Sequence, residues 1–196
     1  MNAVSERRER ERADRHRLIV TAARELAEAE GWEAVTTRRL ADRVEYSQPV
    51  LYSHFNGKNG IVSAVALDGF EQLAAQLRDA REGAPDQAGG KSLGTVCHAY
   101  LDFARTRPAV YQAMFVLPTD LKFASDETPK SMRACFDEFV ACFRPDDDRR
   151  ELSAEVVWSA VHGMAVLAGS GRIPQALQEE RVDFLVSRLS DKPGTS

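Results

Sequence analysis

Apolar residues recur at helical spacing along most of the chain, and glycine, proline and small polar residues separate the runs. The first run spans residues 17–32, where apolar residues repeat at intervals of three and four and so share one face of a helix. They are Leu18, Ile19, Ala22, Ala23, Leu26 and Ala27, and Gly31 is placed to end the helix. No alternation of apolar and polar residues is sustained between turn signals, so the pattern predicts an all-α chain of about nine helices.

The other helices are predicted over residues 37–44, 48–55, 58–81, 93–107, 109–116, 129–144, 149–168 and 174–189. Four of them begin with a capping signal. Thr36 and Ser47 precede two short helices, Thr128 precedes a first-turn Pro129, and Asp148 stands three residues before Glu151. The clearest loop covers residues 83–90, and residues 117–126 are predicted to form an irregular loop.

Charge is unevenly distributed along the chain. The formal net charge is −4, yet residues 1–60 hold 11 Lys and Arg against 10 Asp and Glu, and residues 61–196 hold 15 against 20. A polyanion could therefore bind only at a local patch in the first part. Residues 1–14 are predicted to form a flexible charged arm. Its alternating arginines and acids favour pairing at i,i+4 over a contact with the minor groove of DNA.

Several classes of protein are excluded by composition. The longest near-apolar stretch, residues 156–171, is interrupted by polar residues and is shorter than the about 20 apolar residues that span a bilayer. The first residues contain no apolar segment of the kind found in signal peptides. Cys97, Cys135 and Cys142 have neither disulfide nor zinc spacing. We therefore expect a soluble cytoplasmic protein with no metal, no cofactor and no membrane partner, and the sequence leaves a redox role for the cysteines open.

Residues 36–58 contain two short helices joined by three residues and preceded by another helix, which is the spacing of a helix-turn-helix. The second short helix, residues 48–55, would enter the major groove of DNA, which is about 12 Å wide. The residues expected to contact DNA are Thr36, Thr37, Arg38, Arg39, Ser47, Gln48, Pro49, Leu51, Tyr52, His54 and Lys58. We expect Thr36, Thr37, Tyr52 and Lys58 to contact phosphates, Gln48 and its neighbours to contact bases, and Val50 and Phe55 to point inward.

The same segment resembles the DNA-binding domain of the TetR/AcrR family of bacterial regulators. The resemblance covers residues 15–65 and rests on Leu40-Ala41, Ser47, Leu51-Tyr52, His54-Phe55 and Lys58. Two positions depart from the family pattern, because Glu45 stands where a turn glycine is usual and Asn59-Gly60 replace a glutamate and a helix former. Trp158, His162 and Gly163 are similar to a C-terminal regulatory domain that is named for these three residue types.

The resemblance implies a helix-turn-helix domain at residues 15–62 and an effector-binding and dimerisation domain at residues 63–190, with a disordered tail at residues 191–196. Members of the family form dimers through their last two helices and bind small effectors among the middle ones. This implies a homodimer and an unidentified small-molecule effector here. The candidate effector residues are Phe103, Tyr111, Met114, Phe115, Trp158 and His162, each of which could instead be ordinary core.

The function predicted from these features is that of a DNA-binding transcriptional regulator, namely a repressor that a small-molecule effector releases from a palindromic operator. The alternative is a helical small-molecule-binding or adaptor protein whose helix-turn-helix is not functional. An enzyme with a DNA-binding module would need clustered carboxylates or a nucleophile with basic partners, and no such set occurs, so the prediction is not an enzyme. The effector, the operator, the regulated genes and the sign of regulation stay open.

Overall fold

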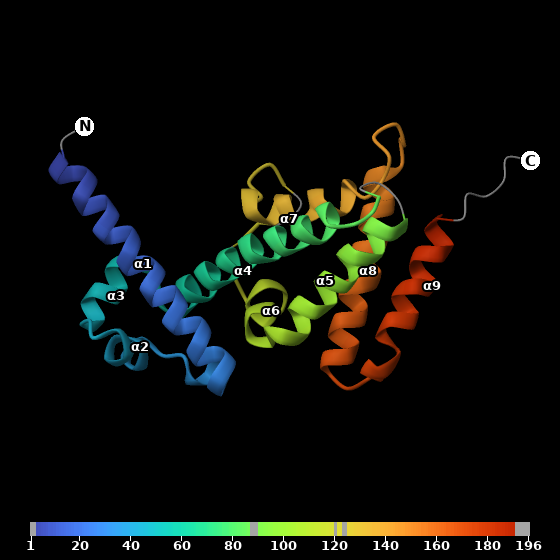
Figure 1. The fold of residues 1–196 in the computed structure, drawn as a ribbon. Coiled ribbons are helices and arrows are strands. Elements are labelled where there is room, and N and C mark those ends of the chain that lie inside the picture. Colours follow the sequence, from blue (N-terminus) through green and yellow to red (C-terminus); the bar gives the residue numbers. More distant parts are fainter. Residues whose placement is uncertain (1–2, 87–89, 120, 123–124, 191–196) are drawn as a thin grey trace, which may run out of the picture. The chain divides into compact units, whose positions relative to one another are not determined.

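The computed structural model describes residues 3–86, 90–119, 121–122 and 125–190, and these residues form helices and loops without a strand (Figure 1). The helices are α1 (Ala3–Glu30), η1 (Trp32–Ala34), α2 (Thr37–Val44), α3 (Gln48–His54), α4 (Gly57–Glu82), α5 (Gly90–Thr106), α6 (Pro108–Phe115), α7 (Lys130–Val140), α8 (Arg150–Gly169), η2 (Gln175–Leu177) and α9 (Gln178–Ser190). The prediction of an all-α chain with about nine helices is confirmed for the described residues. The tail predicted at residues 191–196 and part of the loop predicted at residues 83–90 lie outside them.

The chain forms two compact units. The first unit consists of residues 1–69 and 109–121, and the second consists of residues 70–108 and 122–196. The backbone of α4 therefore starts in the first unit and ends in the second. The segment that contains α6 returns to the first unit although it is separated from it by 39 intervening residues.

A single buried face of α1 organises the first unit. Ile19, Ala23 and Leu26 are buried on this face, together with Leu40 of α2 and Leu51 of α3. Gly31 ends α1 with a φ of 81°, and its N–H donates to the carbonyl of Ala27 over 2.8 Å, as the sequence predicts. Toward its N-terminus, α1 extends over residues 3–14, which we expected to form a flexible arm.

The connection between α2 and α3 contains the one positive φ of a non-glycine residue among the described positions. Thr36 caps α2 as predicted, because its hydroxyl accepts a hydrogen bond from the Arg39 N–H. Glu45, where the family usually has glycine, adopts the left-handed conformation with φ 57° and ψ 34°. A residue with a Cβ thus adopts the left-handed conformation at this turn, where it is strained by about 1 kcal/mol.

Three contacts attach α6 to the N-terminal part of the first unit. The Glu28 carboxylate accepts hydrogen bonds from the N–H groups of Ala109 and Val110 at 3.1 and 3.0 Å, and so satisfies the start of α6. The Trp32 indole N–H donates to the Ala109 carbonyl over 2.8 Å. On α4, a Cβ added at Gly69 would lie 2.5 Å from Val110 Cγ1, so the close approach of α4 and α6 requires glycine at this position.

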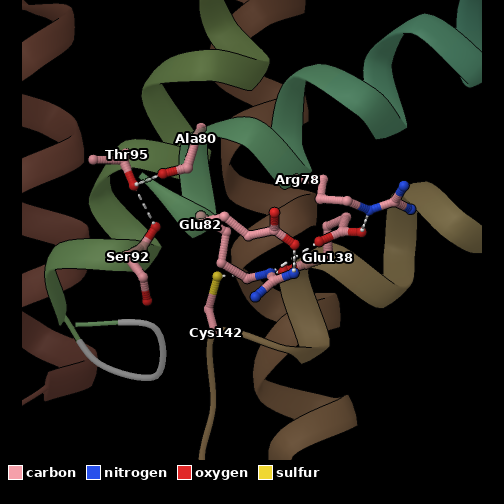
Figure 2. Close-up of polar contacts among 8 residues, drawn as sticks. Arg78, Ala80, Glu82, Ser92, Thr95, Glu138 and Cys142 are labelled. Carbon is pink, nitrogen blue, oxygen red and sulfur yellow. Dashed lines mark hydrogen bonds and ion pairs between the residues drawn. The ribbon is translucent and has the colours of Figure 1, made fainter. Parts of the chain in front are cut away.

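The second unit contains a buried carboxylate at the contact between the C-terminal half of α4 and α7 (Figure 2). Glu138 of α7 is 6% exposed, and its two oxygens accept hydrogen bonds from Arg78 Nε and Arg81 Nε, each over 2.9 Å. The Cys142 thiol donates to the backbone carbonyl of Glu138 over 3.3 Å. Because a buried charge without partners is strongly destabilising, Glu138 holds α7 against two successive turns of α4.

Three boundaries in the second unit differ from the sequence predictions. The helix expected from residue 129 begins at Lys130, because Thr128 accepts from the Ser125 N–H instead of capping, and it ends at Val140 rather than at residue 144. The start of α8 lies at Arg150, and Asp147 rather than Asp148 accepts a hydrogen bond from the Arg149 N–H. The last predicted helix is divided into η2 and α9.

The three cysteines are buried. Burial raises the pKa of Cys97 and of Cys135 to about 12, and that of Cys142 to about 11. The reactive form of cysteine is the thiolate, so at neutral pH these side chains behave as small apolar groups in the core.

Among the described residues, α8 is long and apolar enough to cross a membrane by length and composition alone, with a mean hydropathy of 1.3. It begins six residues before the near-apolar stretch of residues 156–171, which was expected to be too short to span a bilayer. Only 28% of the 18-residue apolar window within it is buried in the chain. A core helix of a soluble protein passes the same test, and much of its apolar surface remains uncovered by the rest of the chain.

The close contact at Gly69 predicts a substitution effect of defined sign. Gly69→Ala should lower the free energy of unfolding by about 1–3 kcal/mol, because the new Cβ would overlap Val110 and Met114. Gly94→Ala in α5 is the matched control, since a Cβ there meets nothing within 4 Å and alanine favours the helix by up to about 1 kcal/mol. Urea unfolding monitored by circular dichroism measures both, and equal effects of the two substitutions would contradict the packing argument.

Candidate nucleic-acid interface

The inner side of α3 is anchored in the core of the first unit. Leu51 is 1% exposed and Phe55, the residue that ends α3, is also buried. The prediction that Phe55 points inward is confirmed, and Val50 is half-buried. The prediction that Leu51 contacts DNA is wrong for this structure, because its side chain packs in the core and has almost no exposed surface.

Polar side chains and a tyrosine occupy the exposed side of α3 and the start of α2. Tyr52 is 58% exposed, and its hydroxyl lies 3.4 Å from the Thr37 hydroxyl, so the two groups can hold one anion between them. Ser47, Gln48 and Pro49 are exposed at the start of α3. Ser47 occupies the N-cap position as predicted, but its hydroxyl makes no capping hydrogen bond and remains available for other partners.

The basic residues of the segment differ in their freedom to contact DNA. Arg39 makes two hydrogen bonds to the Glu30 carboxylate, at 2.9 and 2.8 Å, which raise the pKa of the guanidinium and lower the pKa of the carboxyl group. Arg38 is exposed and has no ion pair within the described part of the chain. The Lys58 amine donates to the Trp32 carbonyl over 2.6 Å and is half-buried, which leaves two of its three N–H groups for a phosphate.

His54 lies at the C-terminal end of α3 in a small aromatic cluster. The His16 ring of α1 stacks on Phe55 with ring centroids 4.6 Å apart, and the His16 and His54 centroids are 6.2 Å apart. Burial lowers the pKa of both imidazoles, and the positive charge of Arg12 lowers both further. His54 is therefore neutral at pH 7, and its place in the cluster reduces its exposed surface to an intermediate level.

The six candidate effector residues are divided between the two units. Tyr111, Met114 and Phe115 lie on α6 in the first unit, with the Tyr111 and Phe115 rings 4.8 Å apart. Phe103, Trp158 and His162 lie in the second unit, where Phe103 is fully buried. The six residues are thus not one cluster in either unit, and their effector role stays a prediction.

A hydrogen-bonded group forms around Trp158 and His162 in the second unit. The Trp158 indole N–H donates to the Tyr100 hydroxyl over 3.3 Å, and the Tyr100 hydroxyl lies 3.2 Å from His162 Nδ1. Burial lowers the pKa of His162, and the neutral ring can share this hydrogen bond with the tyrosine hydroxyl in either of its tautomers. Tyr100 was not found by sequence reasoning, because it stands 58 and 62 residues from its partners and no local spacing indicates the contact.

The family models locate both halves of the chain. Residues 19–65 match the model described as bacterial regulatory proteins, tetR family, and residues 93–189 match the model described as tetracyclin repressor-like, C-terminal domain. The chain belongs to the TetR family of bacterial regulatory proteins. Proteins of this family are regulators of transcription rather than a class of enzymes.

Two curated relatives match parts of the chain. The uncharacterized HTH-type transcriptional regulator YobS of Bacillus subtilis is 33% identical over 97 residues, which is 50% of this chain and 49% of YobS. The class C tetracycline repressor protein of Escherichia coli is 44% identical over 48 residues, which is 24% of this chain and 22% of that protein. The chain thus spans about half or less of the length of these relatives.

Solved structures share the fold at low sequence identity. A Rhodococcus sp. RHA1 protein of unknown function has a TM-score of 0.71 at 23% identity, covering 90% of this chain and 95% of that one. A tetR-family regulatory protein from Rhodococcus RHA1 has a TM-score of 0.63 at 21% identity, covering 90% and 97%. The regulator FadR from Bacillus subtilis, solved in complex with stearoyl-CoA, has a TM-score of 0.63 at 11% identity, covering 87% and 97%.

The cluster around His54 predicts how stability depends on pH. The pKa values of His16 and His54 are lowered from 6.5 in the folded chain, so the unfolded chain binds protons first as the pH falls. The contribution of the neutral rings should be complete above about pH 7.5 and should decrease as the pH falls through about 6.5 toward the folded pKa. Imidazole titration by NMR, in native protein and in urea, measures both states. Native midpoints at or above the unfolded ones would contradict the burial argument.

Proposed function

We propose that the protein is a dimeric repressor of transcription that binds a palindromic DNA operator through α3 of each copy. The single observation that supports this most directly is the two-sided character of α3. Its buried Leu51 fixes the helix in the core, while Gln48 and Tyr52 are exposed and the Tyr52 hydroxyl lies beside the Thr37 hydroxyl. A helix held in this way can insert its polar surface into a major groove.

The proposal assigns two kinds of contact to this surface. Thr36, Thr37, Tyr52 and Lys58 would bind phosphates, which carry most of the affinity without regard to sequence. Gln48, as an amide on the first turn of α3, would contact base edges and so discriminate among sequences. Arg38 has no ion pair within the described part of the chain and would add a further phosphate contact.

The exposed apolar side chains of α8 and α9 support the dimer. Val156 and Leu167 of α8 and Phe184 of α9 are exposed, and Phe184 is 62% exposed. A hollow of about 530 Å³ between the two helices is lined by Met164, Leu177, Glu180, Arg181, Phe184, Leu185 and Arg188. A second copy packed on these helices would cover this apolar surface, which is otherwise costly to expose.

Release by a small-molecule effector is the remaining part of the proposal. FadR of Bacillus subtilis, which has the same fold, was solved with stearoyl-CoA, and this supports a ligand-responsive second unit here. The hydrogen-bonded group of Tyr100, Trp158 and His162 offers polar atoms within an otherwise apolar set of helices. An effector would regulate only if it bound one arrangement of the dimer more tightly than the other.

The two kinds of contact predict different phenotypes in DNA binding. Lys58→Ala should weaken binding to all duplexes and reduce the slope of log K against log salt by about 1, whereas Gln48→Ala should cost about 1–3 kcal/mol on the preferred operator and relax base preference. Fluorescence anisotropy measures both effects, with DNA from the region next to the gene of this protein. Lys91→Ala, which removes an exposed charge of the second unit, is the control, and thermal unfolding shows whether loss of the Lys58–Trp32 contact affects the fold. A change of preferred base in Lys58→Ala would refute the phosphate assignment.

The proposed dimer surface is tested by a charge placed in it. Phe184→Asp should convert the dimer to a monomer, because an unpaired carboxylate would be buried in an apolar contact. Val116→Asp replaces another exposed apolar residue, outside α8 and α9, and should leave the dimer intact. Sedimentation at micromolar concentration distinguishes the two, and a dimeric Phe184→Asp protein would exclude this surface as the interface.

A further inference from the structure

The N-terminal extension of α1 continues a face of the helix that is buried further along. Positions 8, 12, 15, 19 and 26 share one face of a continuous α-helix, because their spacings are three, four and seven residues. Ile19 and Leu26 on this face are buried in the first unit. Toward the N-terminus, the same face carries Arg8, Arg12 and Arg15, which we call the arginine stripe.

The acidic residues of the extension do not neutralise the arginine stripe. Arg7 pairs with Glu11 over 3.3 Å and Arg17 pairs with Asp14, while the Ser5 hydroxyl donates to Glu9. No ion pair of Arg8, Arg12 or Arg15 occurs within residues 3–86 or the rest of the described chain. The pairing expected from the alternating sequence therefore involves the flanks of the helix and leaves three like charges on one face.

The arginine stripe lies beside the C-terminal end of α3. His16, which follows Arg15, stacks on Phe55 at 4.6 Å, and a groove of about 380 Å³ is lined by Glu9, Arg12, Ala13, His16, Arg17 and His54. Arg12 and Arg15 are close enough to His54 that their charges lower its pKa. Figure 1 shows α1 continuing past α3 toward the N-terminus, so the positive surface extends beyond the end of the helix proposed to enter the major groove.

We propose that the arginine stripe binds the phosphate backbone of DNA that flanks the half-site contacted by α3. The proposal rests on the function proposed above, since it extends the same DNA contact outward. Three guanidinium groups within eight residues of helix repel one another, and a continuous row of phosphates supplies the negative charge that offsets this repulsion. Arginine is suited to this role because its planar donors match phosphate oxygens.

The geometry of the helix sets the reach of this contact. Arg8 and Arg15 are two turns apart, about 10 Å along the axis, so the arginine stripe spans at most a few phosphates outside the base pairs at α3. A contact of this kind positions the protein and raises affinity, and it adds no preference among sequences. Binding should therefore depend on the length of the duplex beyond the half-site and not on its base composition.

The test compares two triple variants that remove the same charge from different surfaces. Arg8→Gln/Arg12→Gln/Arg15→Gln removes the arginine stripe, and Arg7→Gln/Arg10→Gln/Lys91→Gln is the matched control, with two changes on other faces of α1 and one at an exposed position of α5. Both keep helix-forming residues, and circular dichroism checks the fold. The duplexes are half-site pairs selected from a random pool by the unmodified protein, either ending at the half-sites or extended by about one helical turn on each side.

The arginine stripe variant should bind the extended duplex roughly tenfold or more weakly than the unmodified protein, with a salt slope reduced by about 0.9 for each lost phosphate contact. On the truncated duplex the two proteins should bind alike, and the control variant should show a much smaller loss on both. Equal losses in the two triple variants, no loss in the stripe variant, or a loss that depends on flanking A·T content would overturn the proposal. In those cases selective binding by the unmodified protein would persist, whereas failure to select any sequence would refute the proposed function itself.

Discussion

The inward packing of Leu51 and Phe55 is the constraint on which the rest of the candidate interface depends. An isolated helix as short as the seven residues of α3 is not stable in water, so only tertiary contacts can keep it helical and fix its direction. Because these two side chains are buried, with Phe55 stacked on His16 of α1, Gln48 and Tyr52 remain exposed and the Tyr52 hydroxyl lies beside Thr37. The left-handed conformation of Glu45 is unfavourable, and the same packing stabilises it. This conformation lets α3 follow α2 after three residues.

The sequence predicts the parts of this structure that are encoded locally. The Thr36 cap, the Gly31 helix end and the spacing of α2 and α3 depend on neighbouring residues, and all three are present as predicted. The inward direction of Leu51 could not be chosen from sequence, because Val50 and Leu51 are adjacent apolar residues and only the packing of α3 decides between them. The Glu28 contact with α6 and the Tyr100 group join residues far apart in the chain, for which no pattern exists.

The second unit has a different kind of organisation at its centre. A carboxylate buried between two arginines contributes little net stability, because desolvation offsets most of the attraction, but its two ion pairs connect α7 to two successive turns of α4 (Figure 2). The exposed apolar residues of α8 and α9 stand in contrast, since nothing in the described chain covers them. The ion pairs of Glu138 thus hold α4 and α7 together inside the unit, whereas α8 and α9 expose apolar side chains on its surface.

The return of α6 to the first unit has a consequence for exchanging modules between relatives. A chimera joined at residue 69 would take α1 to α3 from one parent and α6 from the other. The Trp32 indole and the Glu28 carboxylate would then contact the first turn of α6 from the other parent. The close packing of Gly69 against α6 would not be preserved by design. The unit that contains the candidate DNA interface is therefore made of two separate segments of the chain. A chimera that preserves this unit must also include residues 109–121.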